Sequence, residues 1–170
     1  VLNIITNEFS DFSPEKVITN KIPHDYKPDA KSDLLEKTIR KLACNDASVE
    51  ALLYEALSYS LLRRNELRKS FFLLGDRHNG KSTFLDLLST MLGEENVSTL
   101  DLADVGSEFK TAEITGKLAN IGDDISDGFM ENTSVFKKVV SGEAITVNRK
   151  YQKPVTMTPR AKFYFSANSL

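Results

Sequence analysis

The apolar and polar positions of the chain follow two different periods. Apolar residues recur at helical spacing over residues 33–44, 49–62, 83–92 and 133–140. Short apolar runs that suit buried strands lie at residues 71–74, 97–100, 118–122 and 162–166. Because helices and strands follow one another along the chain, the pattern predicts an α/β fold with a mostly parallel sheet flanked by helices.

The connecting segments are less regular. Residues 145–148 and 155–157 alternate in period two around a basic tip, which predicts a β-hairpin. Residues 101–116 indicate a loop and a helix, and residues 1–30 predict irregular structure with one or two short strands. The first two helices form a pair that leads into strand 71–74. We therefore divide the chain into an accessory region, residues 1–69, and a core domain, residues 70–170.

Two expectations concern the helical pair. The apolar stripe of the second helix is expected to lie in the core, because such stripes usually do. Its members are Val49, Leu52, Leu53, Ala56, Leu57 and Leu61. Cys44 lies on the apolar side of the first helix and is expected to be a small buried residue.

The stretch after strand 71–74 carries the clearest chemical signal. Residues 75–82 read GDRHNGKS and match G-x-x-x-x-G-K-[ST] at every fixed position, between a strand and a helix. Gly75 and Gly80 let the backbone N–H groups point inward as an anion-binding nest at a helix N-terminus. Lys81 reaches the β and γ phosphates, and Ser82 is a ligand for Mg²⁺. The sequence therefore predicts that this chain binds a nucleoside triphosphate. The alternative is an ordinary glycine-containing turn.

The other residues of the loop complete the predicted nucleotide site. They are Asp76, Arg77, His78, Asn79 and Thr83. His78 occupies a variable position of the motif, where we expect it to fill the loop beside the nucleotide.

Polar residues follow two of the predicted strands. Asp123 and Asp124 end strand 118–122, about forty residues after Lys81. In phosphate-loop enzymes a strand-end carboxylate holds Mg²⁺ and a nearby one orients or deprotonates the attacking water. An acidic turn is the alternative, because Asp is common where strands end. Asn168 follows strand 162–166, where its amide can reach the γ-phosphate or the water; a plain turn residue is the alternative there too.

Composition sets limits on other functions. The chain has 170 residues, of which 41% are hydrophobic and 27% charged, enough for one core domain with a small appendage. One cysteine and two histidines make a zinc site implausible. No apolar run approaches the ~20 residues that span a bilayer, and no signal-peptide pattern opens the chain. We therefore expect a cytoplasmic protein with no membrane partner.

Charge is distributed unevenly along the chain. Residues 94–131 carry ten acidic side chains against two lysines, whereas residues 137–162 carry seven basic side chains against Glu143. Arg149, Lys150 and Lys153 flank Tyr151 at the predicted hairpin tip. Cations beside an aromatic ring are typical of sequence-tolerant binding to single-stranded nucleic acid. A solvated basic turn is the alternative.

Taken together, these motifs resemble the superfamily 3 helicases, in particular the helicase domain of phage and plasmid primases. GDRHNGKSTFLDLL resembles the family's first motif, LANIGDD its second, FKKVVSGEAITVNRKYQKP its third and FSAN its fourth. Residues 1–69 resemble the accessory region that precedes this helicase domain. The resemblance covers nearly the whole chain, and four motifs in the right order are more specific than any one.

The resemblance implies a modified AAA+ phosphate-loop core that assembles into a ring, usually a hexamer, and moves along single-stranded DNA as ATP is hydrolysed. Lys81 and Ser82 would bind phosphate and Mg²⁺, Asp123 would be the Mg²⁺-associated carboxylate, Asp124 the catalytic one and Asn168 the sensor. Arg149, Lys150, Tyr151 and Lys153 would lie on a channel hairpin that touches DNA. The implied partners are further copies of the chain, a primase region or other replication proteins, inside a bacterial cell that hosts a phage or plasmid.

Two departures from the family matter. The family more often has Asp-Glu where this chain has Asp123-Asp124, and the shorter side chain reaches less far toward the water. In the family an arginine that acts across the subunit interface lies beyond the sensor, whereas this sequence stops at Leu170. Such a residue contributes about 10³–10⁵ in rate. If nothing follows Leu170, we expect nucleotide binding with little hydrolysis, as in a fragment of a longer protein.

Three alternatives stay open. An AAA+ initiator or loader would use ATP as an assembly switch without processive unwinding. A small-molecule kinase shares the phosphate loop, but it needs an arginine-bearing lid and an acceptor pocket that the sequence does not show. In a non-catalytic interaction module the loop would be structural only.

Overall fold

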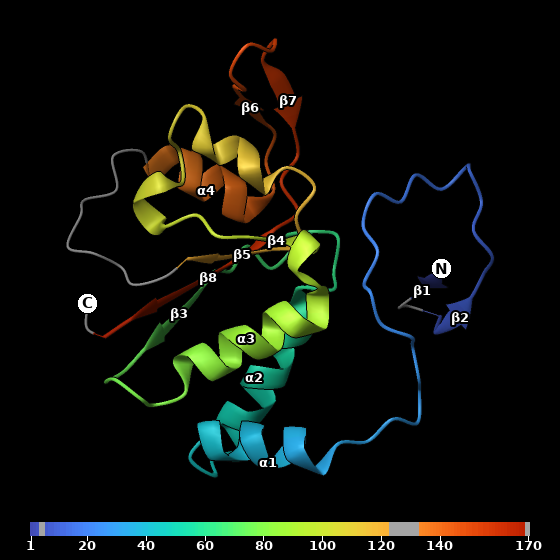
Figure 1. Ribbon diagram of the computed structural model, residues 1–170, viewed down its shortest axis with the longest axis vertical. Helices are drawn as coiled ribbons and strands as arrows, with labels where there is room; N and C mark the ends of the chain where they lie inside the picture. Colours follow the sequence, from blue (N-terminus) through green and yellow to red (C-terminus); the bar gives the residue numbers. More distant parts are fainter. Residues whose placement is uncertain (4–5, 123–132, 169–170) are drawn as a thin grey trace.

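The computed structural model describes residues 1–3, 6–122 and 133–168. Its centre is a four-stranded sheet in the order β3 (Phe71–Leu74), β8 (Lys162–Ala167), β5 (Ala119–Gly122) and β4 (Val97–Ser98). All neighbouring pairs of these strands are parallel (Figure 1). The prediction of a mixed α/β fold with a parallel sheet is confirmed.

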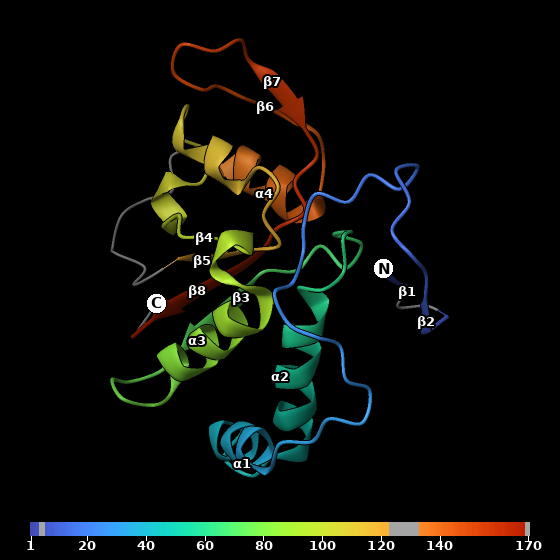
Figure 2. The ribbon, with the colours of Figure 1, turned by 45° about the vertical axis from the view of Figure 1, so that its right-hand side comes forward.

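Helices cover both faces of this sheet (Figures 1 and 2). On one face pack α2 (Ala47–Tyr59) and α3 (Lys81–Leu92), and α1 (Asp33–Leu42) packs against α2 on the side away from the sheet. On the other pack α4 (Thr133–Ser141) and two 3₁₀ turns, Leu102–Asp104 and Lys110–Ile114. Strand β8 serves both cores, because side chains alternate along a strand: Tyr164 joins the first, and Phe163 and Phe165 join the second.

The accessory helices share their core with the sheet. Ile39 of α1 and Leu57 of α2 belong to the same buried cluster as Leu88 of α3. The Tyr164 hydroxyl of β8 donates to the Ala56 carbonyl at 2.6 Å and lies 2.6 Å from Ser60 Oγ at the end of α2. The helical pair is therefore packed directly against the half of the chain that carries the GDRHNGKS motif.

The segment before α1 is mostly irregular. Strands β1 (Leu2–Asn3) and β2 (Glu8–Phe9) pair antiparallel, and residues 10–31 form neither helix nor strand. Its later part is attached near the end of α3. His24 Nε2 lies 2.7 Å from the Thr90 carbonyl, and Asn20 Nδ2 donates to Asn96 Oδ1 at 2.9 Å. Asn96 ends a 3₁₀ turn, Glu94–Asn96, that follows α3.

The predicted hairpin forms from β6 (Ile145–Val147) and β7 (Val155–Met157). It projects away from the sheet at the top of Figure 1. Ile145 and Val147 are buried, whereas the tip between the two strands is exposed except for the half-buried Asn148. The hairpin thus has an anchored base and a free end.

Three expectations for single elements are wrong. Residues 101–116 hold two short 3₁₀ helices, Leu102–Asp104 and Lys110–Ile114, instead of an α-helix; Gly106 and Gly116 take left-handed backbone angles on either side of the second one. Helix α1 ends at Leu42, so Cys44 falls in the following turn with a φ of 52° and is exposed. In the α2 stripe Ala56 and Leu57 are buried, but Val49, Leu52 and Leu61 are exposed.

Within the part of the chain that the structure describes, no helix is both long enough and apolar enough to cross a membrane.

Candidate functional site

The phosphate loop joins β3 to α3, and its geometry explains both motif glycines. Gly80 is the N-cap of α3, with a φ of 89° that favours glycine. A Cβ at Gly80 would lie 2.2 Å from Cδ2 of Leu42, and a Cβ at Gly75 would lie 1.9 Å from Nδ2 of Asn79. A side chain at either position would therefore displace a neighbour.

The amine of Lys81 lies inside the loop among oxygen atoms. It donates to the carbonyls of Gly75 at 2.5 Å and Asp76 at 2.9 Å, and to Asn79 Oδ1 at 3.3 Å. These acceptors are neutral, whereas phosphate oxygens are charged and accept stronger hydrogen bonds. The amine is thus positioned where a phosphate would replace neutral partners with charged ones.

Asn168 lies next to the loop because β8 is the immediate neighbour of β3. Leu74 pairs with Ala167 across these strands, and the Gly75 N–H donates to the Ala167 carbonyl at 3.3 Å. One residue further on, Asn168 Oδ1 accepts from Lys81 Nζ at 3.3 Å. Two residues that are 87 positions apart in sequence therefore meet at the carboxyl edge of the sheet.

A cavity of about 640 Å³ opens beside the loop. Its lining includes residues 78–83, from His78 to Thr83, so it contains the motif lysine and Ser82. The volume falls within the range of about 300–1,000 Å³ that is usual for small-molecule sites. Ser82 and Thr83 are exposed in the first turn of α3, where unpaired backbone N–H groups favour an anion. Asp76 and Arg77 are exposed in the loop. The residues present fit a bound nucleotide.

The same cavity has a second wall that the sequence did not reveal. Thr38, Lys41 and Leu42 of α1 line it opposite the loop. Nothing in the spacing of these residues separates them from ordinary positions of an amphipathic helix, so no sequence signal was available to find them.

The predicted carboxylates, Asp123 and Asp124, lie outside the described residues. Strand β5 ends at Gly122, whose Cβ position is 2.5 Å from Cδ1 of Phe165 and 2.6 Å from the Leu100 carbonyl. Because β3, β5 and β8 run parallel, their carboxyl ends face the same edge of the sheet. The roles of Asp123 and Asp124 stay predictions.

The four predicted DNA-contacting residues lie at the exposed end of the hairpin. Arg149, Lys150, Tyr151 and Lys153 are all exposed, and the Tyr151 side chain is fully accessible. The Gln152 N–H donates to the Arg149 carbonyl at 3.1 Å and closes the turn. The tip therefore presents three cations and one aromatic ring to the solvent.

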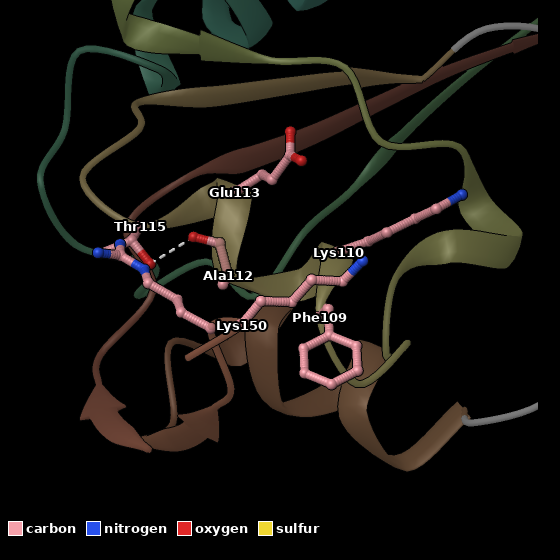
Figure 3. A pocket seen from close by; sticks show the side chains of 7 residues that line it. Phe109, Lys110, Ala112, Glu113, Thr115 and Lys150 are labelled. Carbon is pink, nitrogen blue, oxygen red and sulfur yellow. Dashed lines mark hydrogen bonds between the residues drawn. The ribbon is translucent and has the colours of Figure 1, made fainter. Parts of the chain in front are cut away.

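A second cavity, of about 670 Å³, lies at the base of this tip (Figure 3). Arg149 and Lys150 line it from the hairpin, and Phe109 and Lys110 line it from the 3₁₀ segment. Lys150 extends across the cavity toward Phe109 and Lys110 in this view. Asn148 Nδ2 donates to Glu108 Oε1 at 3.2 Å, which ties the hairpin to the same segment.

Phe109 therefore extends the aromatic surface that the hairpin tip begins, whereas the charge of Lys110 is paired with Asp104 and the acidic Glu113 lines the same cavity. The Lys110 amine is 2.6 Å from Asp104 Oδ2, and this hydrogen bond raises the lysine's pKa above its usual value. Phe109 is 44% exposed, which leaves part of its ring accessible. Sequence reasoning placed both residues in a structural helix, because only the fold brings them beside the hairpin.

Comparison with known proteins gives a family and a fold. Residues 73–170 match the sequence profile of DUF5906, a family of unknown function. No curated protein matches the sequence significantly. Among solved structures, one of the NrS-1 C-terminal region has a TM-score of 0.66 at 21% identity, over 88% of this chain and 34% of that one. A second structure of this region has a TM-score of 0.65 at 21% identity, covering 88% of this chain and 35% of that one.

A structure of JCV helicase with a bound small molecule is also similar, with a TM-score of 0.51 at 17% identity. The match covers 79% of this chain and 40% of the helicase chain. At such low identity these likenesses show a shared fold. This chain spans about a third of the length of the NrS-1 structures it matches.

Proposed function

The chain belongs to the DUF5906 family through residues 73–170, and we propose that it is the ATP-binding motor domain of a DNA helicase or translocase. The observation that carries the proposal is the contact of Lys81, which lines the cavity beside the loop, with Asn168 at the carboxyl edge of a parallel sheet. That edge is where open α/β sheets bind their ligands. The fold shared with JCV helicase supports the same assignment.

The roles of the site residues follow from their chemistry. The loop from Gly75 to Thr83 holds the phosphates through backbone N–H groups and the Lys81 amine. Ser82 and Asp123 would hold Mg²⁺, which would neutralise charge on the phosphates when bound. Asp124 accepts a proton from the attacking water, and the Asn168 amide orients that water or the γ-phosphate.

Single-stranded DNA is the proposed partner of the hairpin. Arg149, Lys150 and Lys153 attract backbone phosphates, and Tyr151 offers a ring on which a base can stack. The exposed ring of Phe109 continues the aromatic part of this surface at the base of the hairpin. Contacts of this kind read no sequence, which suits an enzyme that moves along a strand.

The proposed motor has the AAA+ architecture of superfamily 3 and works as a ring, a hexamer in the full-length protein. Copies of the chain, a primase region and other replication proteins of a phage or plasmid are its proposed partners. A loader or initiator that assembles on ATP without unwinding is the second candidate, and the experiment below separates the two.

The test is fluorescence anisotropy of a labelled single-stranded oligonucleotide, with and without Mg²⁺ and a non-hydrolysable ATP analogue. We expect the nucleotide to increase DNA affinity and added salt to weaken it. The Arg149→Ala/Lys150→Ala double variant should lose most of this binding. Lys27→Ala/Lys69→Ala, which removes two exposed cations elsewhere on the described surface, is the matched control and should not.

The Lys81→Ala variant distinguishes failure of the phosphate-loop assignment from failure of the DNA assignment. It should abolish nucleotide binding while the protein stays folded; retained nucleotide binding would refute the phosphate-loop assignment. Absence of DNA binding in a protein that binds nucleotide and assembles would refute the DNA assignment. Assembly on ATP without strand separation by the full-length protein would favour the loader.

A further inference from the structure

Helix α1 lies against the phosphate loop, although it belongs to the segment before the matched family region. We infer that α1 is the outer wall of the nucleotide site and that Lys41 contacts the phosphates of a bound nucleoside triphosphate. This inference rests on the proposed function, because it assigns further residues to the same site. It makes the accessory region part of the ATP-binding machinery.

The position of α1 is fixed by packing. Ile39 is fully buried in the core beneath the sheet, and Leu42 lies over Gly80 so closely that a Cβ there would force the Leu42 side chain to move. Arg40 Nε lies 3.7 Å from Glu50 Oε2 of α2 and points to a different neighbour. Because the buried contacts set the rotation of the helix, Thr38, Lys41 and Leu42 are held on the cavity side.

The C-terminal end of α1 would be unfavourable for a phosphate without the positive charge of Lys41. A helix C-terminus bears partial negative charge and would repel a phosphate. Here the following turn caps the last carbonyls: the N–H groups of Ala43, Asn45 and Cys44 donate to Ile39, Arg40 and Lys41, respectively. Lys41 adds a full positive charge at the same end. The wall that faces the loop is therefore suited to an anion.

The shape of the cavity favours a nucleoside triphosphate over a free phosphate. Its 640 Å³ extends from Lys81 and Ser82 to α1, whereas an inorganic phosphate would need only the loop. Leu42 gives an apolar surface, and the Thr38 hydroxyl, which donates to the Leu34 carbonyl at 2.7 Å, can still accept a hydrogen bond. These groups suit a sugar and base that continue beyond the phosphates.

The experiment measures binding of a fluorescent non-hydrolysable ATP analogue with Mg²⁺. Lys41→Ala should weaken binding by roughly three- to tenfold, the size of one charge-assisted contact that is open to solvent. Lys41→Glu should weaken it further, and the difference from the unchanged protein should shrink as salt is added. Lys41 is exposed, so neither variant removes a buried side chain.

Arg40→Ala is the matched control, because it removes the same charge from the same helical turn but does not line the cavity. The affinity of the Arg40→Ala variant for the ATP analogue should stay within about twofold of that of the unchanged protein. If Lys41→Glu binds as tightly as Arg40→Ala while Lys81→Ala loses binding, the inference about α1 fails and the proposed function stands. If Lys81→Ala also binds normally, the proposed function itself fails.

Discussion

At Gly80 the phosphate loop and α1 approach so closely that a single methyl group decides the fit. The residue needs its left-handed φ of 89° to begin α3, and Cδ2 of Leu42 occupies the space a side chain would take. The motif alone accounts for the first requirement. The second arises only from the packing of a helix that lies some forty residues earlier in the chain.

This double requirement gives the first prediction. Gly80→Ala should lower the free energy of unfolding by about 1–3 kcal/mol, from backbone strain plus the forced movement of Leu42. Gly116→Ala is the control, since its φ is 75° but nothing lies within 4 Å of its Cβ position. It should cost only the strain, about 1 kcal/mol. Urea denaturation measures both.

A double-mutant cycle then isolates the contact. In a Leu42→Ala background, Gly80→Ala should cost no more than Gly116→Ala, because the obstructing Cδ2 is gone. An unchanged cost in that background would mean that Leu42 does not limit the space at Gly80.

At the scale of elements, β8 is joined to α2 through a buried lysine. Lys162 is 1% exposed, donates to the carbonyls of Leu62 and Arg160, and lies 4.9 Å from the centre of the Tyr59 ring. No carboxylate is paired with it among the ion pairs of the described residues. Burial lowers the pKa of Lys162 from 10.5 to about 8.

The lowered pKa of Lys162 determines whether the free energy of unfolding rises or falls with pH. A lysine with a lowered pKa in the folded state holds fewer protons there than in the unfolded chain between about pH 8 and 10.5. The free energy of unfolding should therefore rise with pH through this window, by about 2 kcal/mol from about pH 7 to about pH 9.5. Burial raises the pKa of Tyr59 and Tyr164, so the tyrosines oppose this trend only above their ordinary value of 10.0.

Urea denaturation at several pH values, with Lys162→Met as the control, tests this second prediction. The stability of the variant should change much less with pH, because the side chain no longer titrates; its loss of the hydrogen bonds to the Leu62 and Arg160 carbonyls is the same at every pH. Equal slopes for the two proteins would place the titrating group elsewhere.

The local sequence pattern was sufficient to predict some elements of the fold but not others. Strand β3, the loop and α3 follow from an apolar run, two glycines and helical spacing, which are local properties. Lys162 shows the limit: the sequence counts it in a basic segment, whereas the fold buries it. Similarly, the α2 stripe is half exposed, because which part of an amphipathic face is covered depends on where its partner elements end.

In the whole molecule, one strand connects the two candidate sites. Strand β8 follows the hairpin with only residues 158–161 between Met157 and Lys162, and it ends beside Asn168 at the phosphate loop. Phe163 and Phe165 pack against Phe136 of α4, and Tyr164 packs against Phe71 at 4.8 Å between ring centres. Strand β8 is therefore packed on both faces between the two candidate sites. No local pattern could have predicted this link, because it depends on the insertion of β8 between β3 and β5.

This connection leads to the last prediction, which rests on the proposed function. Bound nucleotide would draw Lys81 away from Asn168 Oδ1 and change the contacts at one end of β8, while DNA would act on the hairpin before its other end. Asn168→Ala should therefore leave each ligand able to bind alone but reduce the factor by which the ATP analogue increases DNA affinity. Coupling between sites is typically about 5- to 150-fold, so its loss is measurable by anisotropy.

Reciprocity provides the internal control for this experiment. The DNA-induced gain in nucleotide affinity must fall by the same factor in Asn168→Ala, because the coupling free energy is shared by both ligands. Thr90→Ala, an exposed substitution on α3 whose side chain does not line the nucleotide cavity, should keep the full coupling. Full coupling in Asn168→Ala would show that the two sites communicate by a route other than the end of β8, such as contacts between neighbouring copies in a ring.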